Sequence, residues 1–292
     1  MSDRPLISAN ALLASDTTLE QFIDLWLKGK SPNSQRAYRR DIQYFLDFLA
    51  DQSLAELTLN DVHAYLDQLE THGWSEATVN RRIAAVKSLL TFGNATGVLR
   101  VNVGSAVRLK KMSKKFSQRT LTESQVLMMI AQTPGDRDRI LLRFMYAVGC
   151  RVSELCDLKW ENITANPDGT ATVHIFGKGR KNRWVKFSAA TWQELQTLRG
   201  DATPADFLFA SRQGGVGLKP NQVRTIVKAA GNRIHLTDVS PHWLRHSHAG
   251  HSVQRNVPLT LLQETLGHES LNTTRNYIAA NPTDSSGMHL PI

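Results

Sequence analysis

The residues with the clearest chemical capability lie in the last third of the chain. His242 and Arg245 follow a Ser-Pro pair that is typical of a helix start, and their spacing of three places both on one face of the first turns. His268 follows a glycine that can end a helix, and Tyr277 lies nine residues later in a polar run. Imidazole, guanidinium and phenol groups gathered in this way could carry out nucleophilic attack on a phosphate.

The composition favours a polyanionic partner. The 292 residues include 35 Lys and Arg against 26 Asp and Glu, a formal net charge of +9, which indicates nucleic acid first and an anionic membrane surface second. Hydrophobic residues make up 41% of the chain, enough for buried cores in one large domain or two ordinary ones.

The sequence also favours a cytoplasmic protein without a membrane partner. No apolar run approaches the roughly 20 residues that span a bilayer, and the N-terminus lacks the apolar core of a signal peptide. With so few cysteines and no export signal, Cys150 and Cys156 are expected to be buried thiols rather than a disulfide.

Apolar residues at helical spacing predict four short amphipathic helices in the first hundred residues. They begin near residues 17, 31, 60 and 75 and would form a small bundle after a loose arm at 1–16. Six basic residues are expected on the outer sides of the second and fourth helices: Arg36, Arg39, Arg40, Arg81, Arg82 and Lys87. Such clusters are equally consistent with a solvated face and with contacts to DNA.

A change of composition marks a domain boundary. Residues 108–119 are basic and poor in apolar residues, so we expect them to link a domain at 17–107 to one at 120–292. In the second domain, helices are expected at about 122–131, 136–148, 189–199, 219–230, 241–254, 258–266 and 271–279, with a strand pair at 170–176 and 183–187 and a further short strand at 207–210. The expected fold is mainly α with a small antiparallel β-sheet.

Two further stretches of the second domain carry chemistry. The strand pair meets at residues 177–182, a glycine-rich hairpin tip with three cations. Upstream, Arg151 precedes Glu154 by one helical turn, and taken alone it would most simply be a helix-surface residue paired with Glu154 or Asp157.

Four motifs together resemble the tyrosine recombinases, also called the phage integrase family. They are Gly-Cys-Arg-Val-Ser-Glu-Leu (149–155), Gly-Lys-Gly-Arg-Lys-Asn-Arg (177–183), His-Trp-Leu-Arg-His (242–246) and Leu-Gly-His-Glu-Ser (266–270) followed by Tyr277. The resemblance covers about residues 17–280, and the chain is similar in size to the bacterial Xer-type members. It implies a two-domain, C-shaped clamp around double-stranded DNA, with an N-terminal DNA-binding domain and a C-terminal catalytic domain.

The resemblance also implies an activity. The protein would cleave and rejoin DNA at specific sites through a 3′-phosphotyrosine intermediate, for dimer resolution of chromosomes or plasmids or for integration and excision of an element. We expect a monomer when free and a homo- or hetero-tetramer on two DNA sites.

The chemistry of a phosphodiester explains these residue types. In-line attack concentrates negative charge on the non-bridging oxygens, which Arg151 and Arg245 would hold with forked, permanently charged hydrogen bonds. The resemblance makes Tyr277 the nucleophile, and the covalent link would conserve the phosphodiester so that religation needs no ATP. Because side chains supply the positive charge, we expect no cofactor and no metal.

Other residues would handle protons and orient their neighbours. Lys178 on the hairpin is expected to protonate the leaving 5′-oxygen, with Lys181 as a rival by sequence. The resemblance implies that His242 acts as base or positions the proton of the tyrosine, that His268 donates a hydrogen bond to the scissile phosphate, and that Glu154 orients a catalytic side chain.

Three alternatives stay open at this point. A DNA-relaxing type IB topoisomerase shares the phosphotyrosine chemistry, and a DNA-binding regulator could keep the residues without the reaction. The histidines at 242, 246, 248 and 251 could bind zinc, although no HExxH pattern and no suitably spaced Cys or carboxylate accompanies them.

Overall fold

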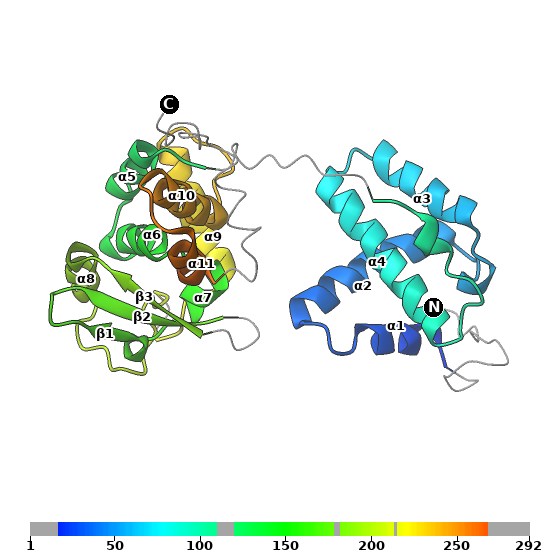
Figure 1. Ribbon diagram of the computed structural model, residues 1–292, viewed down its shortest axis with the longest axis horizontal. Coiled ribbons are helices and arrows are strands. Elements are labelled where there is room, and N and C mark those ends of the chain that lie inside the picture. Colours follow the sequence, from blue (N-terminus) through cyan, green and yellow to red (C-terminus); the bar gives the residue numbers. More distant parts are fainter. Residues whose placement is uncertain (1–16, 110–119, 178–181, 213–214, 268–292) are drawn as a thin grey trace, which may run out of the picture. The chain divides into compact units, whose positions relative to one another are not determined.

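The chain folds into two compact units, residues 1–114 and 115–292 (Figure 1). The computed structural model describes residues 17–109, 120–177, 182–212 and 215–267. Within this part of the chain, no helix combines the length and the apolar character that crossing a bilayer requires.

The N-terminal unit is a bundle of four helices. They are α1 (Leu19–Leu27), α2 (Pro32–Leu49), α3 (Leu59–Thr71) and α4 (Glu76–Ala95). Thr18, Ser31, Thr58 and Ser75 precede them, and each side chain accepts a hydrogen bond from a backbone N–H of the first turn, which satisfies a donor that the helix leaves open. Helix α4 packs against the other three around a core that includes Phe22, Phe45 and Tyr65 (Figure 1).

One basic residue of this bundle is buried. Arg82 on α4 is 6% exposed, and its guanidinium carbon lies 3.9 Å from the ring centre of Tyr44 and 4.3 Å from that of Trp74. Beside it, the fully buried Asp41 of α2 forms an ion pair with Arg81. The expectation that Arg82 points outward is therefore wrong, because two aromatic rings cover its charge.

The C-terminal unit combines helices with one small sheet. Its helices are α5 (Glu123–Ala131), α6 (Asp136–Val148), α7 (Val152–Asp157), α8 (Ala189–Gln196), α9 (Pro220–Arg233), α10 (Pro241–Gln254) and α11 (Leu259–Leu266). Strands β1 (Ile163–Ala165), β2 (Ala171–Phe176) and β3 (Asn182–Phe187) form an antiparallel sheet in the order β1-β2-β3. The prediction of a mainly α fold with a small antiparallel sheet is confirmed.

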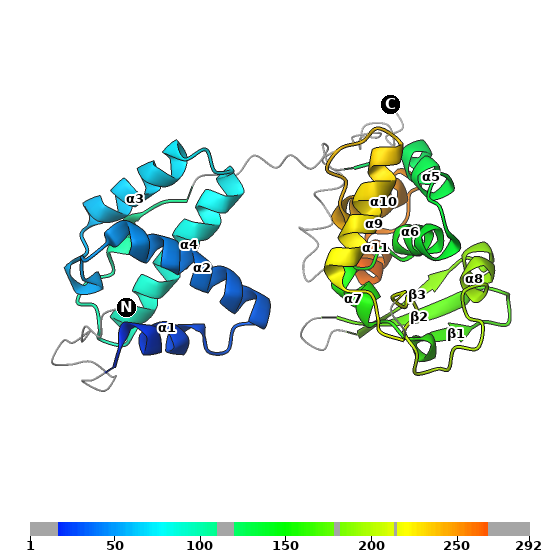
Figure 2. The same cartoon turned by 180° about the vertical axis from the view of Figure 1, so that it is seen from behind.

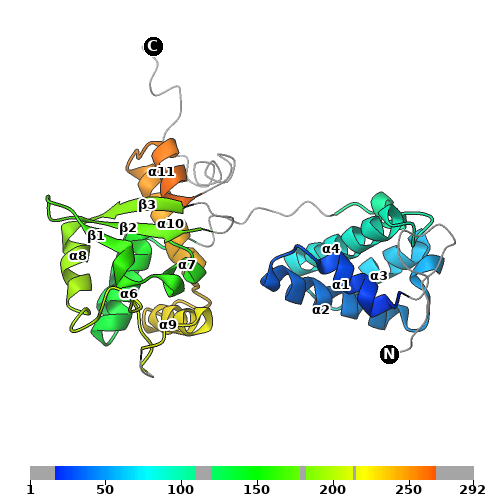
Figure 3. The ribbon, with the colours of Figure 1, turned by 90° about the horizontal axis from the view of Figure 1, so that it is seen from below.

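The sheet and α10 organise this unit. Alternate residues of β2 and β3, such as Val173 and Val185, face the core, and Figure 3 shows α6 and α8 on one side of the sheet and α11 beside β3. Helix α10 packs against α5, α6, α9 and α11, as Figure 2 shows from behind. This packing holds the N-terminal end of α10 and the C-terminal end of α11 within the same group of helices.

One predicted strand is absent, and one observed strand was not predicted. Residues 207–210 form no strand and make only isolated bridges, Lys159 with Phe207 and Ala210 with Gly217. The third strand is instead β1, which pairs with β2 from Ile163 opposite Val173. Its three residues are too few for an alternating pattern to be recognised in the sequence.

Candidate active site

Arg245 connects three helices near the N-terminal end of α10. Its side chain is buried, with the residue 5% exposed. Nη1 donates to the carbonyl of Gly149 at 2.6 Å, and Nη2 donates to the carbonyl of Leu266 at 2.6 Å. Gly149 ends α6 and Leu266 ends α11, so the planar fork of one guanidinium fixes both helix ends relative to α10.

His242 lies one turn before Arg245 and is exposed. Partial burial of the ring lowers its pKa from the ordinary value, and the positive charges of Arg245, Arg224 and Arg151 lower it further. The imidazole is therefore neutral near neutral pH and can accept a proton. Arg224, on α9, is a neighbouring cation that the sequence motifs did not indicate.

Arg151 and Glu154 meet at the start of α7. The backbone N–H of Arg151 donates to Oε2 of Glu154 at 2.7 Å, and its Nη1 donates to Oε1 at 2.8 Å. Glu154 is 6% exposed, whereas the Arg151 side chain keeps 39% of its surface exposed. Part of the Arg151 side chain therefore stays accessible to a ligand. Because Glu154 is buried, the interaction is not the simple surface pair that the sequence alone suggested.

Arg183 is a third guanidinium of this cluster and was not among the site residues predicted from the sequence. It is 8% exposed on β3, and its Nη1 and Nη2 donate to the two carboxylate oxygens of Glu154 at 3.1 Å and 2.7 Å. The alternation of outward and inward residues along β3 could have indicated it, because Arg183 shares the buried face with Val185 and Phe187. A charged residue at an inward position needs a buried partner.

Three guanidiniums converge on the C-terminal end of α11. The consecutive carbonyl groups of residues 265–267 accept hydrogen bonds from Arg183 Nε at 2.8 Å, Arg245 Nη2 at 2.6 Å and Arg151 Nη2 at 3.4 Å. The last carbonyls of a helix have no partner within it and carry the negative end of its dipole, so cations stabilise them. The chain then turns at Gly267 in the left-handed conformation, with φ of 63°.

Glu154 keeps its negative charge within this cluster. Burial raises its pKa, but the hydrogen bonds from Arg183 and from the Arg151 backbone outweigh burial and lower the pKa to about 2. Three arginines and one ionised carboxylate give Arg151, Glu154, Arg183 and Arg245 a formal charge of +2. A cluster of guanidiniums with an exposed side is suited to bind the oxygens of a phosphodiester.

The remaining predicted site residues, Lys178, His268 and Tyr277, lie outside the described residues. The structure thus brings together Arg151, Glu154, His242 and Arg245 of the predicted set. It describes the chain directly before two of the others, since β2 ends at Phe176 and α11 leads to Gly267.

Two further histidines of α10, His248 and His251, contact α6. Nδ1 of His248 lies 2.8 Å from the carbonyl oxygen of Tyr146, and Nδ1 of His251 lies 2.8 Å from its hydroxyl. Within the described ranges, no three His, Cys, Asp or Glu side chains are grouped as metal ligands. These contacts assign His248 and His251 to the packing of α10 on α6.

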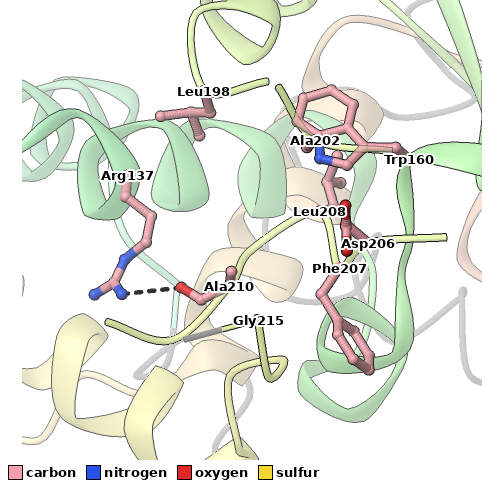
Figure 4. Close-up of a pocket in the computed structure, with 9 residues that line it drawn as sticks. All are labelled: Arg137, Trp160, Leu198, Ala202, Asp206, Phe207, Leu208, Ala210 and Gly215. Carbon is pink, nitrogen blue, oxygen red and sulfur yellow. Dashed lines mark hydrogen bonds between the residues drawn. The ribbon is translucent and has the colours of Figure 1, made fainter. Parts of the chain in front are cut away.

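A cavity of about 400 Å³ lies elsewhere in the C-terminal unit (Figure 4). Trp160 and parts of the segment 198–215 line it, and Arg137 at its edge donates from Nη1 to the carbonyl of Ala210 at 3.0 Å. None of the candidate-site residues Arg151, Glu154, Arg183, His242 and Arg245 is among those that line it.

Comparison with known proteins identifies the group to which the chain is related. The sequence profile of the phage integrase family matches residues 119–284, and that of the phage integrase N-terminal SAM-like domain matches residues 19–97. The chain belongs to the phage integrase family. The predicted family is confirmed, and this family member is a site-specific tyrosine recombinase of Xer type.

Curated relatives of this tyrosine recombinase match along most of its length. Tyrosine recombinase XerC of Oceanobacillus iheyensis is 32% identical over 282 residues, which cover 89% of this chain and 91% of the relative. Tyrosine recombinase XerA of Pyrococcus furiosus is 34% identical over 265 residues, which cover 89% of this chain and 88% of the relative.

Solved structures share the fold of this tyrosine recombinase. XerH bound to difH substrate, in a pre-cleavage complex, aligns with a TM-score of 0.68 at 22% identity over 90% of this chain and 82% of that chain. A lambda integrase dimer bound to a COC′ core site aligns with a TM-score of 0.74 at 19% identity over 92% of this chain and 98% of that chain.

Proposed function

We propose that this tyrosine recombinase closes around double-stranded DNA and exchanges strands between two specific sites in a tetramer. In this proposal, residues 17–107 form the DNA-binding domain, residues 120–292 form the catalytic domain, and the basic segment 108–119 links them along the phosphate backbone. The biological reaction is dimer resolution of chromosomes or plasmids, or integration and excision of an element.

The convergence of guanidiniums at the end of α11 is the observation that carries the proposed chemistry. Arg151 and Arg245 would bind the non-bridging oxygens of the scissile phosphate and stabilise the charge that develops in the transition state. Before DNA arrives, Arg245 is held by two backbone carbonyls and Arg151 by Glu154, so little rearrangement is needed when the phosphate binds.

Cleavage would proceed by attack of the Tyr277 hydroxyl oxygen on phosphorus. The bond from tyrosine oxygen to phosphorus forms as the bond from phosphorus to the 5′-oxygen breaks. The tyrosine proton passes to His242, whose lowered pKa keeps it neutral beforehand, and Lys178 gives a proton to the leaving 5′-oxygen. His268 would donate a hydrogen bond to the phosphate, and attack by a 5′-hydroxyl on the phosphotyrosine reverses these steps.

Related solved structures support DNA as the partner and an assembly on it. XerH is described with its difH substrate, and lambda integrase as a dimer on a core site and as a tetramer on a Holliday junction. The net charge of +9 supports the same partner for this chain. The free protein is proposed to be a monomer, because the DNA sites would bring the protomers together.

The exposed basic residues of α2 are the proposed DNA contacts of the N-terminal unit. Arg36, Arg39 and Arg40 are exposed, with Arg39 paired to Asp24. The basic residues of α4 that were predicted to contact DNA have less exposed side chains. Arg81 forms an ion pair, Lys87 donates to a backbone carbonyl, and Arg82 is buried. We therefore expect α2 to contribute more to phosphate binding than α4.

Formation of the covalent adduct tests the proposal directly. Sequencing the DNA trapped on the protein identifies its site, and a nicked suicide duplex of that site then accumulates the phosphotyrosine product. Wild-type protein should give an adduct on a denaturing gel, while Tyr277→Phe should bind the duplex with unchanged affinity and give none.

Tyr146→Phe is the matched control, because Tyr146 is the other tyrosine of the C-terminal unit and its hydroxyl contacts His251. This variant should still form the adduct. An adduct with Tyr277→Phe would refute the assignment, and relaxation of supercoiled plasmid without site preference would favour a type IB topoisomerase. Binding without any wild-type adduct would favour a regulator.

A further inference from the structure

Arg183 is more tightly held than any other guanidinium that contacts Glu154. Three of its nitrogens donate hydrogen bonds, two to the Glu154 carboxylate and one to the carbonyl of Thr265. Its side chain is 8% exposed, against 39% for Arg151. Because all three guanidinium nitrogens of Arg183 already donate to Glu154 and Thr265, this side chain is committed to protein partners rather than to a DNA phosphate.

The Glu154 carboxylate receives hydrogen bonds from both arginines on each of its oxygens. Oε1 accepts from Arg151 Nη1 at 2.8 Å and Arg183 Nη1 at 3.1 Å. Oε2 accepts from the Arg151 backbone at 2.7 Å and Arg183 Nη2 at 2.7 Å. With Arg183 present, the three side chains carry a formal charge of +1. Without it, Arg151 and Glu154 would form a neutral pair.

The geometry points to Arg183 as a positioning residue that keeps Arg151 available for the scissile phosphate. Arg183 neutralises the buried carboxylate, so Glu154 can orient Arg151 through one Nη1 bond without cancelling its charge. In the absence of Arg183, the uncompensated carboxylate would draw Arg151 into a closed pair and away from the DNA. This role rests on the proposed function, because Arg151 acts on phosphate only if the protein cleaves DNA.

A purely structural role for Arg183 makes a different prediction. Its bond to Thr265 joins β3 to α11, and loss of that bond would disturb the site whatever the charge at position 154. If Arg183 acts by compensating charge, removing the charge of Glu154 removes the need for it. The two roles can therefore be separated by a double-mutant cycle between Arg183 and Glu154.

The cycle uses Arg183→Met, Glu154→Gln and the double variant in the full-length chain. Single-turnover cleavage of the suicide duplex should be about 10- to 100-fold slower for Arg183→Met, the range typical of a partner that orients a reactive group, with duplex affinity within about twofold of wild type. In the Glu154→Gln background, Arg183→Met should change the rate by no more than about threefold. If Arg183→Met slows cleavage equally in the wild-type and Glu154→Gln backgrounds, or slows it in neither, the inference is overturned.

Two further variants keep the test valid if Arg183→Met folds poorly. Arg183→Lys retains the charge without the planar fork and should cleave faster than Arg183→Met. Arg143→Met is the matched control, because Arg143 pairs with Glu194 at 3.0 Å on α6 and α8, outside the candidate site, and its loss should leave cleavage unchanged. Cleavage by Arg183→Lys no faster than by Arg183→Met would contradict the charge role.

A measurement without DNA separates this inference from the proposed function. Glu154 has a lowered pKa of about 2, so its pairing stabilises the fold above its ordinary pKa of 4.5 and loses that effect as pH falls towards 2. The destabilisation by Arg183→Met should therefore be largest at neutral pH and shrink below about 4.5, and in the Glu154→Gln background it should not vary with pH. A loss of folding stability by Arg183→Met that is independent of pH in both backgrounds would refute charge coupling. Absence of a wild-type adduct would refute the proposed function alone.

Discussion

Cys150 lies directly before Arg151 and shares the interior of the candidate site without a polar role. Burial raises the pKa of its thiol to about 12, and the negative charge of Glu154 acts in the same direction. Cys156 is only partly buried, yet burial raises its pKa to about 11. The expectation of buried thiols is thus confirmed for Cys150, whereas Cys156 is only partly buried.

The two thiols should react slowly in the folded protein. The thiolate is the reactive form, and a raised pKa keeps both groups protonated at pH 8. Native protein mixed with a chromogenic disulfide reagent should therefore release colour only at the rate of local or global opening, whereas protein in guanidinium should release two equivalents at once. Immediate reaction of one equivalent with native protein would show that one thiol is exposed or activated.

The end of α11 is the element on which the candidate site depends. Its last carbonyls hold three arginines, and Gly267 turns the chain there with a positive φ. A Cβ at Gly267 would lie 3.2 Å from Nη1 of Arg183. The glycine therefore serves both the turn and the close approach of that guanidinium.

Gly267→Ala should lower both stability and cleavage. Left-handed backbone costs an alanine about 1–2 kcal/mol, and the added methyl group also presses on Arg183. Gly73→Ala is the matched control, since Gly73 follows α3 with φ of 69° and has no atom within 4 Å of its would-be Cβ. Thermal unfolding should show a loss of stability for both variants, at least as large for Gly267→Ala as for Gly73→Ala, with slower single-turnover cleavage for Gly267→Ala alone. Equal cleavage by the two variants would contradict the role given to the end of α11.

The elements were more predictable from the sequence than the contacts between them. Helix starts are local signals, and Ser31, Ser75 and Thr122 cap helices where the sequence predicted them. Arg183 is different, because its partners lie 29 and 82 residues away and belong to other elements. Motif order selected Arg151, Glu154, His242 and Arg245, but only the fold shows that a further arginine compensates the buried carboxylate.

At the scale of the whole molecule, charge rather than any single contact should govern DNA affinity. A protein that neutralises phosphates releases their condensed counterions, and each released ion makes binding more sensitive to salt. Residues 115–292 carry a formal charge of +7 and residues 1–114 one of +2, and Arg36 and Arg40 are exposed on α2. Binding by both units should therefore give a steeper salt dependence than the C-terminal site alone can supply.

The salt dependence of duplex binding measures this contribution. Fluorescence anisotropy of a labelled duplex between 50 and 200 mM salt should give a log–log slope of about −0.9 per phosphate neutralised. Arg36→Gln and Arg40→Gln should each reduce the slope by about 1 if the side chain contacts a phosphate, while Arg139→Gln, whose charge is already paired with Asp136 and Glu194, should leave it unchanged. An unchanged slope for both α2 variants would exclude α2 from the DNA interface. Salt-insensitive binding by the wild type would contradict the proposed clamp, because a clamp that encloses a duplex must contact its phosphates.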